Sequence, residues 1–126
     1  MKLDSIFVVT FLNAVAFAAP SYSPRITISV TNDLTGRNAV TTIPANGRFQ
    51  NISSLFKNSA IDEHGRILAS SAQLVGFVEN VFCSFNNKDI VIPLNSAATF
   101  AVLGRDLESA SLVPTLLNNF QLQCQV

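Results

Sequence analysis

ILASSAQLVGFVENVFCSF, residues 67–85, is the most continuously apolar run of the chain after residue 18. The polar pair Ser70-Ser71 and the glycine Gly76 interrupt this run, and a glycine weakens the interior of a strand. We therefore expect two strands, near residues 66–74 and 77–86, rather than one long strand. The rest of the fold is expected to assemble around this pair.

The second of these strands carries a cysteine on an apolar face. Strand residues that are two apart share a face. One face is therefore expected to hold Phe77, Val81, Cys83 and Phe85. Glu79 has the same parity, which predicts a position at the margin of the sheet or beside a bulge.

The last strand offers a partner for that cysteine. At residues 120–126, apolar residues alternate with three glutamines, so Cys124 shares the apolar face. In an oxidising compartment, two cysteines most simply form one disulfide. Free thiols or an intermolecular bridge are the alternatives. A Cys83–Cys124 bridge would close a loop of about 42 residues, for which the chain-entropy model gives roughly 4 kcal/mol as an upper figure.

The remaining pattern is typical of an all-β protein. Residues 25–31 alternate cleanly between apolar and polar, and they pair with residues 37–43 through the turn at 32–36. Further strands are expected at residues 48–52, 90–93 and 99–103. A helical turn is expected within residues 53–59, capped by Ser53 or Ser54, and a second helical turn within 104–110. We therefore predict one small β-sandwich or barrel of about seven or eight short strands.

The N-terminus reads as a targeting segment. Lys2 precedes an apolar run at residues 6–18, which ends in the small-x-small pattern of a signal-peptidase site. The run is shorter than the roughly 20 residues that a membrane span needs. A buried N-terminal helix is the alternative. We expect a signal peptide at residues 1–18 and a secreted, extracellular β-domain at 19–126.

The charges exclude some classes of partner. The chain has eight basic and eight acidic residues and a formal net charge of zero. It holds no basic run or patch, so we expect no nucleic-acid partner. It holds no basic amphipathic helix, which argues against adsorption to anionic membranes.

Catalytic residues are sparse. His64 is the only histidine, within the turn Asp62-Glu63-His64-Gly65. A general base is conceivable there, but a solvated turn histidine is the expected role. One histidine with no spare cysteine does not make a usual structural zinc site. Neither H-E-x-x-H nor G-x-S-x-G occurs. We expect no metal, no cofactor and no enzyme, although counting residues does not exclude a Ser-His-Asp triad.

Carboxylates are the second type of side chain that we consider as catalytic candidates. A glycosidase pair would have to come from Asp62, Glu63, Glu79, Asp89, Asp106 and Glu108. Five of the six fall in or beside predicted turns and are expected to be solvated. The exception is Glu79, which is either a strand-margin charge paired with a cation or a binding or catalytic carboxylate.

Two features of the sequence bear on glycans. Asn51-Ile52-Ser53 is an N-glycosylation sequon. The motif is used if it lies at the surface of a secreted chain, but it is short and often coincidental. A sugar-binding platform usually needs exposed flat aromatics. The chain has no tryptophan and only one tyrosine, Tyr22, and its phenylalanines are expected mostly in the core, which disfavours a lectin.

Several segments together resemble a known family. They are ISVTNDLTG at 28–36, residues 40–47 ending in Ala-Asn-Gly, SLF at 54–56, HGRILASSAQL at 64–74, NVFC at 80–83, and Cys124. In these segments the chain resembles the small secreted fungal hypersensitive response-inducing proteins, which act as elicitors on plants. The resemblance covers most of the mature chain and includes no catalytic signature. Some relatives carry more cysteines than the single pair found here.

The resemblance implies secretion into the plant apoplast and recognition by a host component. It carries over no functional residue. Our first hypothesis is a non-enzymatic secreted elicitor or effector whose partner is a host plant protein or a cell-wall glycan. The alternative is a carbohydrate-binding protein associated with the fungal cell wall. The hypothesis we rank last is a small secreted hydrolase.

Overall fold

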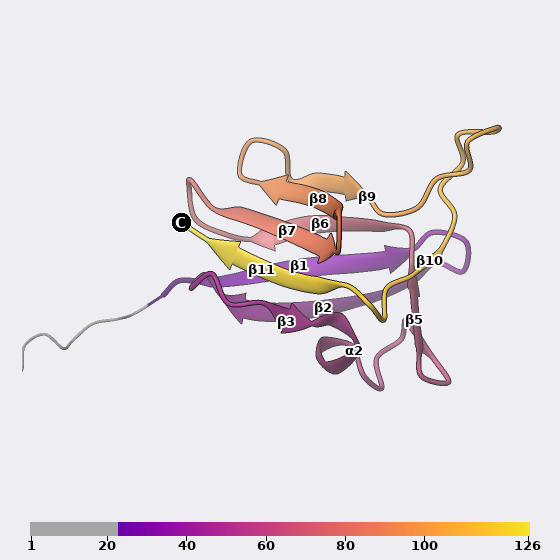
Figure 1. Cartoon of the computed structure of the whole chain (residues 1–126), viewed down its shortest axis with the longest axis horizontal. Helices are drawn as coiled ribbons and strands as arrows, with labels where there is room; N and C mark the ends of the chain where they lie inside the picture. Colours follow the sequence, from indigo (N-terminus) through magenta and orange to yellow (C-terminus); the bar gives the residue numbers. More distant parts are fainter. Residues whose placement is uncertain (1–22) are drawn as a thin grey trace, which may run out of the picture.

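A computed structural model describes residues 23–126, and the expected signal peptide and Tyr22 lie outside the described residues. The described chain is mostly β (Figure 1). Its elements are β1 (Arg25–Asn32), β2 (Arg37–Pro44), β3 (Gln50–Asn51), α2 (Ile52–Leu55), β4 (Asp62–Glu63), β5 (Arg66–Ala69), β6 (Ser71–Gly76), β7 (Phe82–Asn87), β8 (Ile90–Asn95), β9 (Phe100–Val102), β10 (Thr115–Leu116) and β11 (Gln121–Gln125).

The strands form three antiparallel sheets. Two of the sheets have four strands, in the orders β2-β1-β6-β9 and β3-β11-β7-β8, and a small third sheet has the order β10-β5-β4. The two larger sheets overlie each other in Figure 1 and share one core. Within residues 23–126 no sheet closes into a barrel. Of the two predicted architectures, the sandwich is therefore the correct one. β3, β4 and β10 hold two residues each, and the other eight strands match the expected number.

The core lies between the inner faces of the two larger sheets. The largest fully buried side chains include Phe56, Phe85 and Leu122. The prediction that the phenylalanines lie mostly in the core is wrong. The exposed fraction reaches 56% for Phe49, 42% for Phe77, 39% for Phe82 and 53% for Phe100. These four lie in loops or on strand faces that point away from the core.

The run at residues 67–85 forms three strands, not two. β5 ends at Ala69 and β6 begins at Ser71, so the first break falls at Ser70 rather than at Gly76. The backbone of Ser70 donates to the Thr31 carbonyl and accepts from the Leu103 amide, both at 2.8 Å. These bonds to β1 and to the end of β9 turn the chain from the small sheet into the four-stranded sheet.

The next segment, residues 77–81, is a loop between β6 and β7, and the strand expected from residue 77 begins only at Phe82. Phe77 and Glu79 are therefore exposed loop residues, and Glu79 is not part of a strand. Val81 and Cys83 are buried, as expected. Gly76 ends β6, beside a shift of register between β1 and β6.

Of the two predicted helical turns, the first is confirmed and the second is wrong. A single turn, α2, follows β3, but it begins at Ile52 with Asn51 at its N-cap position, so neither serine caps it. Residues 104–110 form turns without a helix. No helix within residues 23–126 has the length and the apolar character needed to cross a membrane.

The disulfide joins two neighbouring strands of one sheet. Cys83 of β7 and Cys124 of β11 lie directly opposite each other, with their Cα atoms 4.0 Å apart. Such close spacing is typical of a non-hydrogen-bonded antiparallel pair. The predicted intramolecular bridge is therefore confirmed. Because both cysteines are fully buried, the bridge is part of the core.

Candidate functional site

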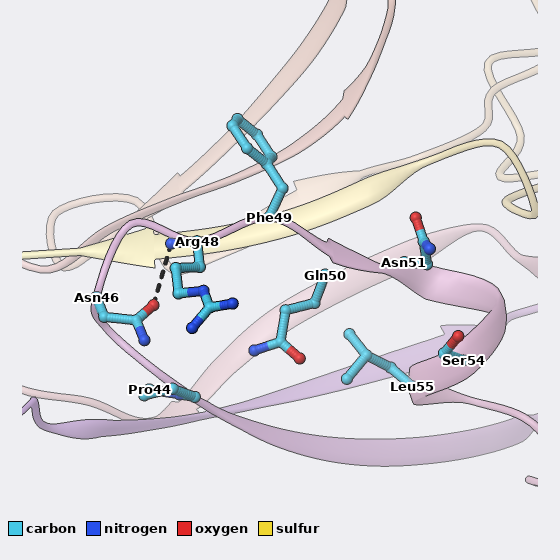
Figure 2. A pocket seen from close by; sticks show the side chains of 8 residues that line it. All are labelled: Pro44, Asn46, Arg48, Phe49, Gln50, Asn51, Ser54 and Leu55. Carbon is cyan, nitrogen blue, oxygen red and sulfur yellow. Dashed lines mark hydrogen bonds between the residues drawn. The ribbon is translucent and has the colours of Figure 1, made fainter.

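The loop from β2 to β3 and the helix α2 enclose a surface hollow of about 430 Å³ (Figure 2). The residues that line it are Pro44, Asn46, Arg48, Phe49, Gln50, Asn51, Ser54 and Leu55. Arg48 is the only charged side chain among them. This hollow, which we call the Arg48 hollow, is the candidate recognition site.

Backbone hydrogen bonds to distant strands hold the loop in place. Gly47 has a φ of +79° and donates its N–H to the Cys124 carbonyl at 2.8 Å. Glycine adopts this left-handed conformation without a steric penalty. Asn46 forms an isolated β-bridge with Gln125, and its side-chain Oδ1 accepts the Arg48 N–H at 3.0 Å (Figure 2). The wall of the hollow is therefore fixed to β11, next to the disulfide.

Residues 48–51 divide into two sides. Side chains of an extended segment alternate in direction. In Figure 2, Arg48 and Gln50 point into the hollow, whereas Phe49 and Asn51 point to the opposite side of the segment. One short piece of chain therefore serves two different surfaces.

The inner side presents a guanidinium and amides above an apolar floor. Arg48 is exposed, and no hydrogen bond of its guanidinium is recorded within residues 23–126. Asn46 and Gln50 contribute amides, while Pro44 and Leu55 contribute apolar surface. A guanidinium offers up to five N–H donors in a fork that fits carboxylates and carbonyl oxygens. The hollow is thus suited to polar ligands with acceptor oxygens.

The only histidine of the chain lies in another hollow. Thr35, Arg37, Asp62, Glu63 and His64 line a depression of about 560 Å³. His64 is exposed, in a turn with a φ of +55°, as expected for a solvated turn residue. Asp62 accepts the backbone N–H groups of Asn58 at 2.7 Å and Gly65 at 2.8 Å. These two bonds, with that of Asn58 the stronger cause, lower the pKa of Asp62.

The structure does not bring Glu79 together with Asp106 or Glu108. Glu79 lies in the loop between β6 and β7, and Asp106 and Glu108 lie beyond β9, at opposite ends of the molecule in Figure 1. Asp106 accepts the Glu108 N–H at 3.1 Å and the Ser109 hydroxyl at 2.9 Å, and these bonds lower its pKa. The general acid of a glycosidase needs a raised pKa instead. Asp89 is exposed in the turn between β7 and β8.

Metal ligands are likewise dispersed. Among residues 23–126, no three His, Cys, Asp or Glu side chains come together in a group that could hold a metal ion.

Comparisons with protein-family models, with curated proteins and with solved structures find no match for this chain.

Sequence reasoning missed the Arg48 hollow. The only local signals were the Asn46-Gly47 turn and the short alternating segment after it. The floor comes from Pro44 of β2 and Leu55 of α2, and which residues meet there depends on the tertiary fold.

Proposed function

We propose that this chain is a secreted fungal effector-like protein that elicits a hypersensitive defence response when a plant component recognises its surface. In this proposal the protein acts by binding and catalyses no reaction. The observation that supports it best is the Arg48 hollow, where an exposed guanidinium stands among amides above an apolar floor. Arginine is one of the residue types that dominate binding energy at protein interfaces. The family resemblance supports the biological role.

The test is infiltration of purified, oxidised protein into leaves, with cell death and defence signalling as the readouts. Arg48→Ala removes the guanidinium and is expected to raise the dose that gives a half-maximal response by about tenfold, the effect of losing roughly 1.4 kcal/mol of binding. Arg66→Ala is the matched control, because Arg66 is also exposed but lies on β5, outside the hollow. His64→Ala should also remain active.

Two results would refute the proposal. One is a folded wild-type protein that gives no response at micromolar dose in any host tested. The other is an Arg48→Ala variant as active as Arg66→Ala, which would show that the Arg48 hollow is not the surface that the plant component recognises.

A wall-associated carbohydrate-binding protein is the second candidate. The amides of Asn46 and Gln50 line the hollow and are groups that pair with sugar hydroxyls. This candidate predicts that the protein is retained on insoluble chitin or glucan and that retention falls for Gln50→Ala. Equal recovery from the polysaccharide and from an inert resin would exclude it.

A further inference from the structure

The outer side of residues 49–51 presents an aromatic ring and a sequon asparagine together. Phe49 and Asn51 are two residues apart in extended chain and point to the same side in Figure 2. Phe49 is 56% exposed, and Asn51 is exposed as well. The sequon therefore lies at the surface, which the sequence alone left open.

The amide of Asn51 is oriented by its neighbour across the sheet. Gln121 lies opposite Asn51 in the pairing of β11 with β3, and its Nε2 donates to Asn51 Oδ1 at 3.1 Å. Within residues 23–126, no hydrogen bond of Asn51 Nδ2 is recorded. The nitrogen that would carry a glycan is free, while the oxygen is held.

A second hollow lies on this same side. It measures about 660 Å³, and its lining residues are Phe49, Asn86, Asn87, Lys88, Asn119 and Gln121. Apart from the phenyl ring and one lysine, every side chain there is an amide. The apolar face of a pyranose ring packs on an aromatic ring, while amides pair with its hydroxyl and acetamido groups. Gln121 links the hollow to Asn51, so a sugar attached to Asn51 lies within its reach.

We propose that Asn51 carries an N-linked glycan whose first N-acetylglucosamine packs against Phe49 in this second hollow. The inference rests on the secretion that the proposed function includes, because the donor is a lipid-diphosphate-linked oligosaccharide of the secretory pathway. The bond from the anomeric carbon to the diphosphate oxygen breaks, and a bond from that carbon to Asn51 Nδ2 forms. Nδ2 loses one proton, which passes to the solvent, and the lipid diphosphate leaves with the electron pair of the broken bond.

The proposal accounts for two features of this surface. It gives the exposed Phe49 ring a covering group, and it gives the amide-lined hollow a ligand supplied by the chain itself. Asn51 also borders the Arg48 hollow, but Arg48 and Gln50 point to the other side of the segment, so the glycan and the guanidinium lie on different sides of it. Glycosylation and recognition are therefore separable in experiment.

The test begins with expression of the full chain in a eukaryotic secretory host. Intact-mass and peptide-mapping spectra of the secreted protein are expected to show a glycan on Asn51. Ser53→Ala destroys the sequon, leaves Asn51 in place and should abolish the added mass. A folded, disulfide-bonded secreted protein with unmodified Asn51 overturns the proposal, and so does retention of the whole chain unprocessed in the cytosol.

The position of the first sugar needs a second measurement. An endoglycosidase that leaves one N-acetylglucosamine on Asn51 is applied, and Tm is compared with that of Ser53→Ala. The single sugar should raise Tm by on the order of 5 °C. In a Phe49→Ala background this gain should vanish, whereas Phe100→Ala, which removes an equally exposed ring from β9, should preserve it.

An equal gain in the Phe49→Ala and Phe100→Ala backgrounds would overturn the packing on Phe49. Leaf infiltration of the Ser53→Ala protein separates the two proposals. A response with Asn51 bare shows that recognition does not require the glycan. A glycosylated protein without a response contradicts the elicitor role alone.

Discussion

Gly104 lies where the chain leaves β9 and passes close to the segment before β10. It accepts the Val113 N–H at 3.1 Å and donates to the Ser70 carbonyl at 3.3 Å. A Cβ at this position would lie 2.2 Å from the Val113 carbonyl oxygen. The requirement for glycine comes from the Val113 backbone, so this neighbouring segment has to move to admit a methyl group.

Gly104→Ala is therefore expected to lower the free energy of unfolding by about 1–3 kcal/mol, measured by denaturant titration. Gly76→Ala is the matched control. There the nearest atom to the new Cβ is Thr27 Cβ, at 3.2 Å, so a much smaller shift than at Gly104 admits the methyl group. A loss at Gly104 no larger than that at Gly76 would contradict the close approach.

Asp62 provides a pH-dependent contribution at the residue scale. Its pKa is lowered in the fold from an ordinary 3.8, first by the Asn58 N–H and then by the Gly65 N–H. A carboxyl group with a lowered pKa stabilises the fold above its unfolded pKa, and this stability is lost as pH falls through the folded pKa. The contribution should thus be complete at neutral pH, shrink as pH approaches 3.8 and be lost as pH falls through the lower folded pKa.

The measurement compares wild type with Asp62→Asn in unfolding titrations from pH 7 downward. The stability difference should stay constant until about pH 5 and then shrink in acid. Asp89→Asn serves as the control, because Asp89 is exposed and has no recorded hydrogen bond among the described residues. A difference that remains constant down to pH 2 would mean that the Asp62 charge is irrelevant to this turn.

At the scale of elements, predictions from sequence succeed where the determinants are local. The β1–β2 hairpin follows from clean alternation and from Asn32, whose Oδ1 accepts the N–H groups of Leu34 at 3.1 Å and Thr35 at 3.3 Å. Both signals lie within the hairpin itself. The β11 strand, with its alternating glutamines, was predictable for the same reason.

Predictions from sequence fail where contacts between residues far apart in the chain determine the local structure. The corner at Ser70 depends on Thr31, on Leu103 and on Asp33, whose carboxylate accepts the Ser70 hydroxyl at 2.6 Å. Nothing between residues 67 and 85 specifies these partners. Two of the two-residue strands arise in the same way, since β3 pairs with β11 and β10 pairs with β5, whereas β4 pairs locally with β5. The Arg48 hollow belongs to this class, because β11 holds its wall in place.

At the scale of the whole molecule, the disulfide links core stability to the candidate site. Cys83 and Cys124 join strands 41 residues apart in the sequence, in the middle of the four-stranded sheet that ends the chain. The Cys124 carbonyl also accepts the Gly47 N–H at 2.8 Å, so the bridged residue directly supports the loop that carries Arg48. Loosening β11 should therefore affect both stability and recognition.

The double variant Cys83→Ala, Cys124→Ala tests this coupling without leaving a free thiol. Removing a native disulfide of this loop length should cost about 2–4 kcal/mol and lower Tm by roughly 10–20 °C. Reductant should bring wild type close to the variant and leave the variant unchanged. Because β11 then holds the Gly47 loop less firmly, the leaf response per mole of protein should decrease. This decrease should already be seen at temperatures well below the melting transition, where the variant is still folded. Full activity of the folded variant would show that the Arg48 hollow keeps its shape without the bridge.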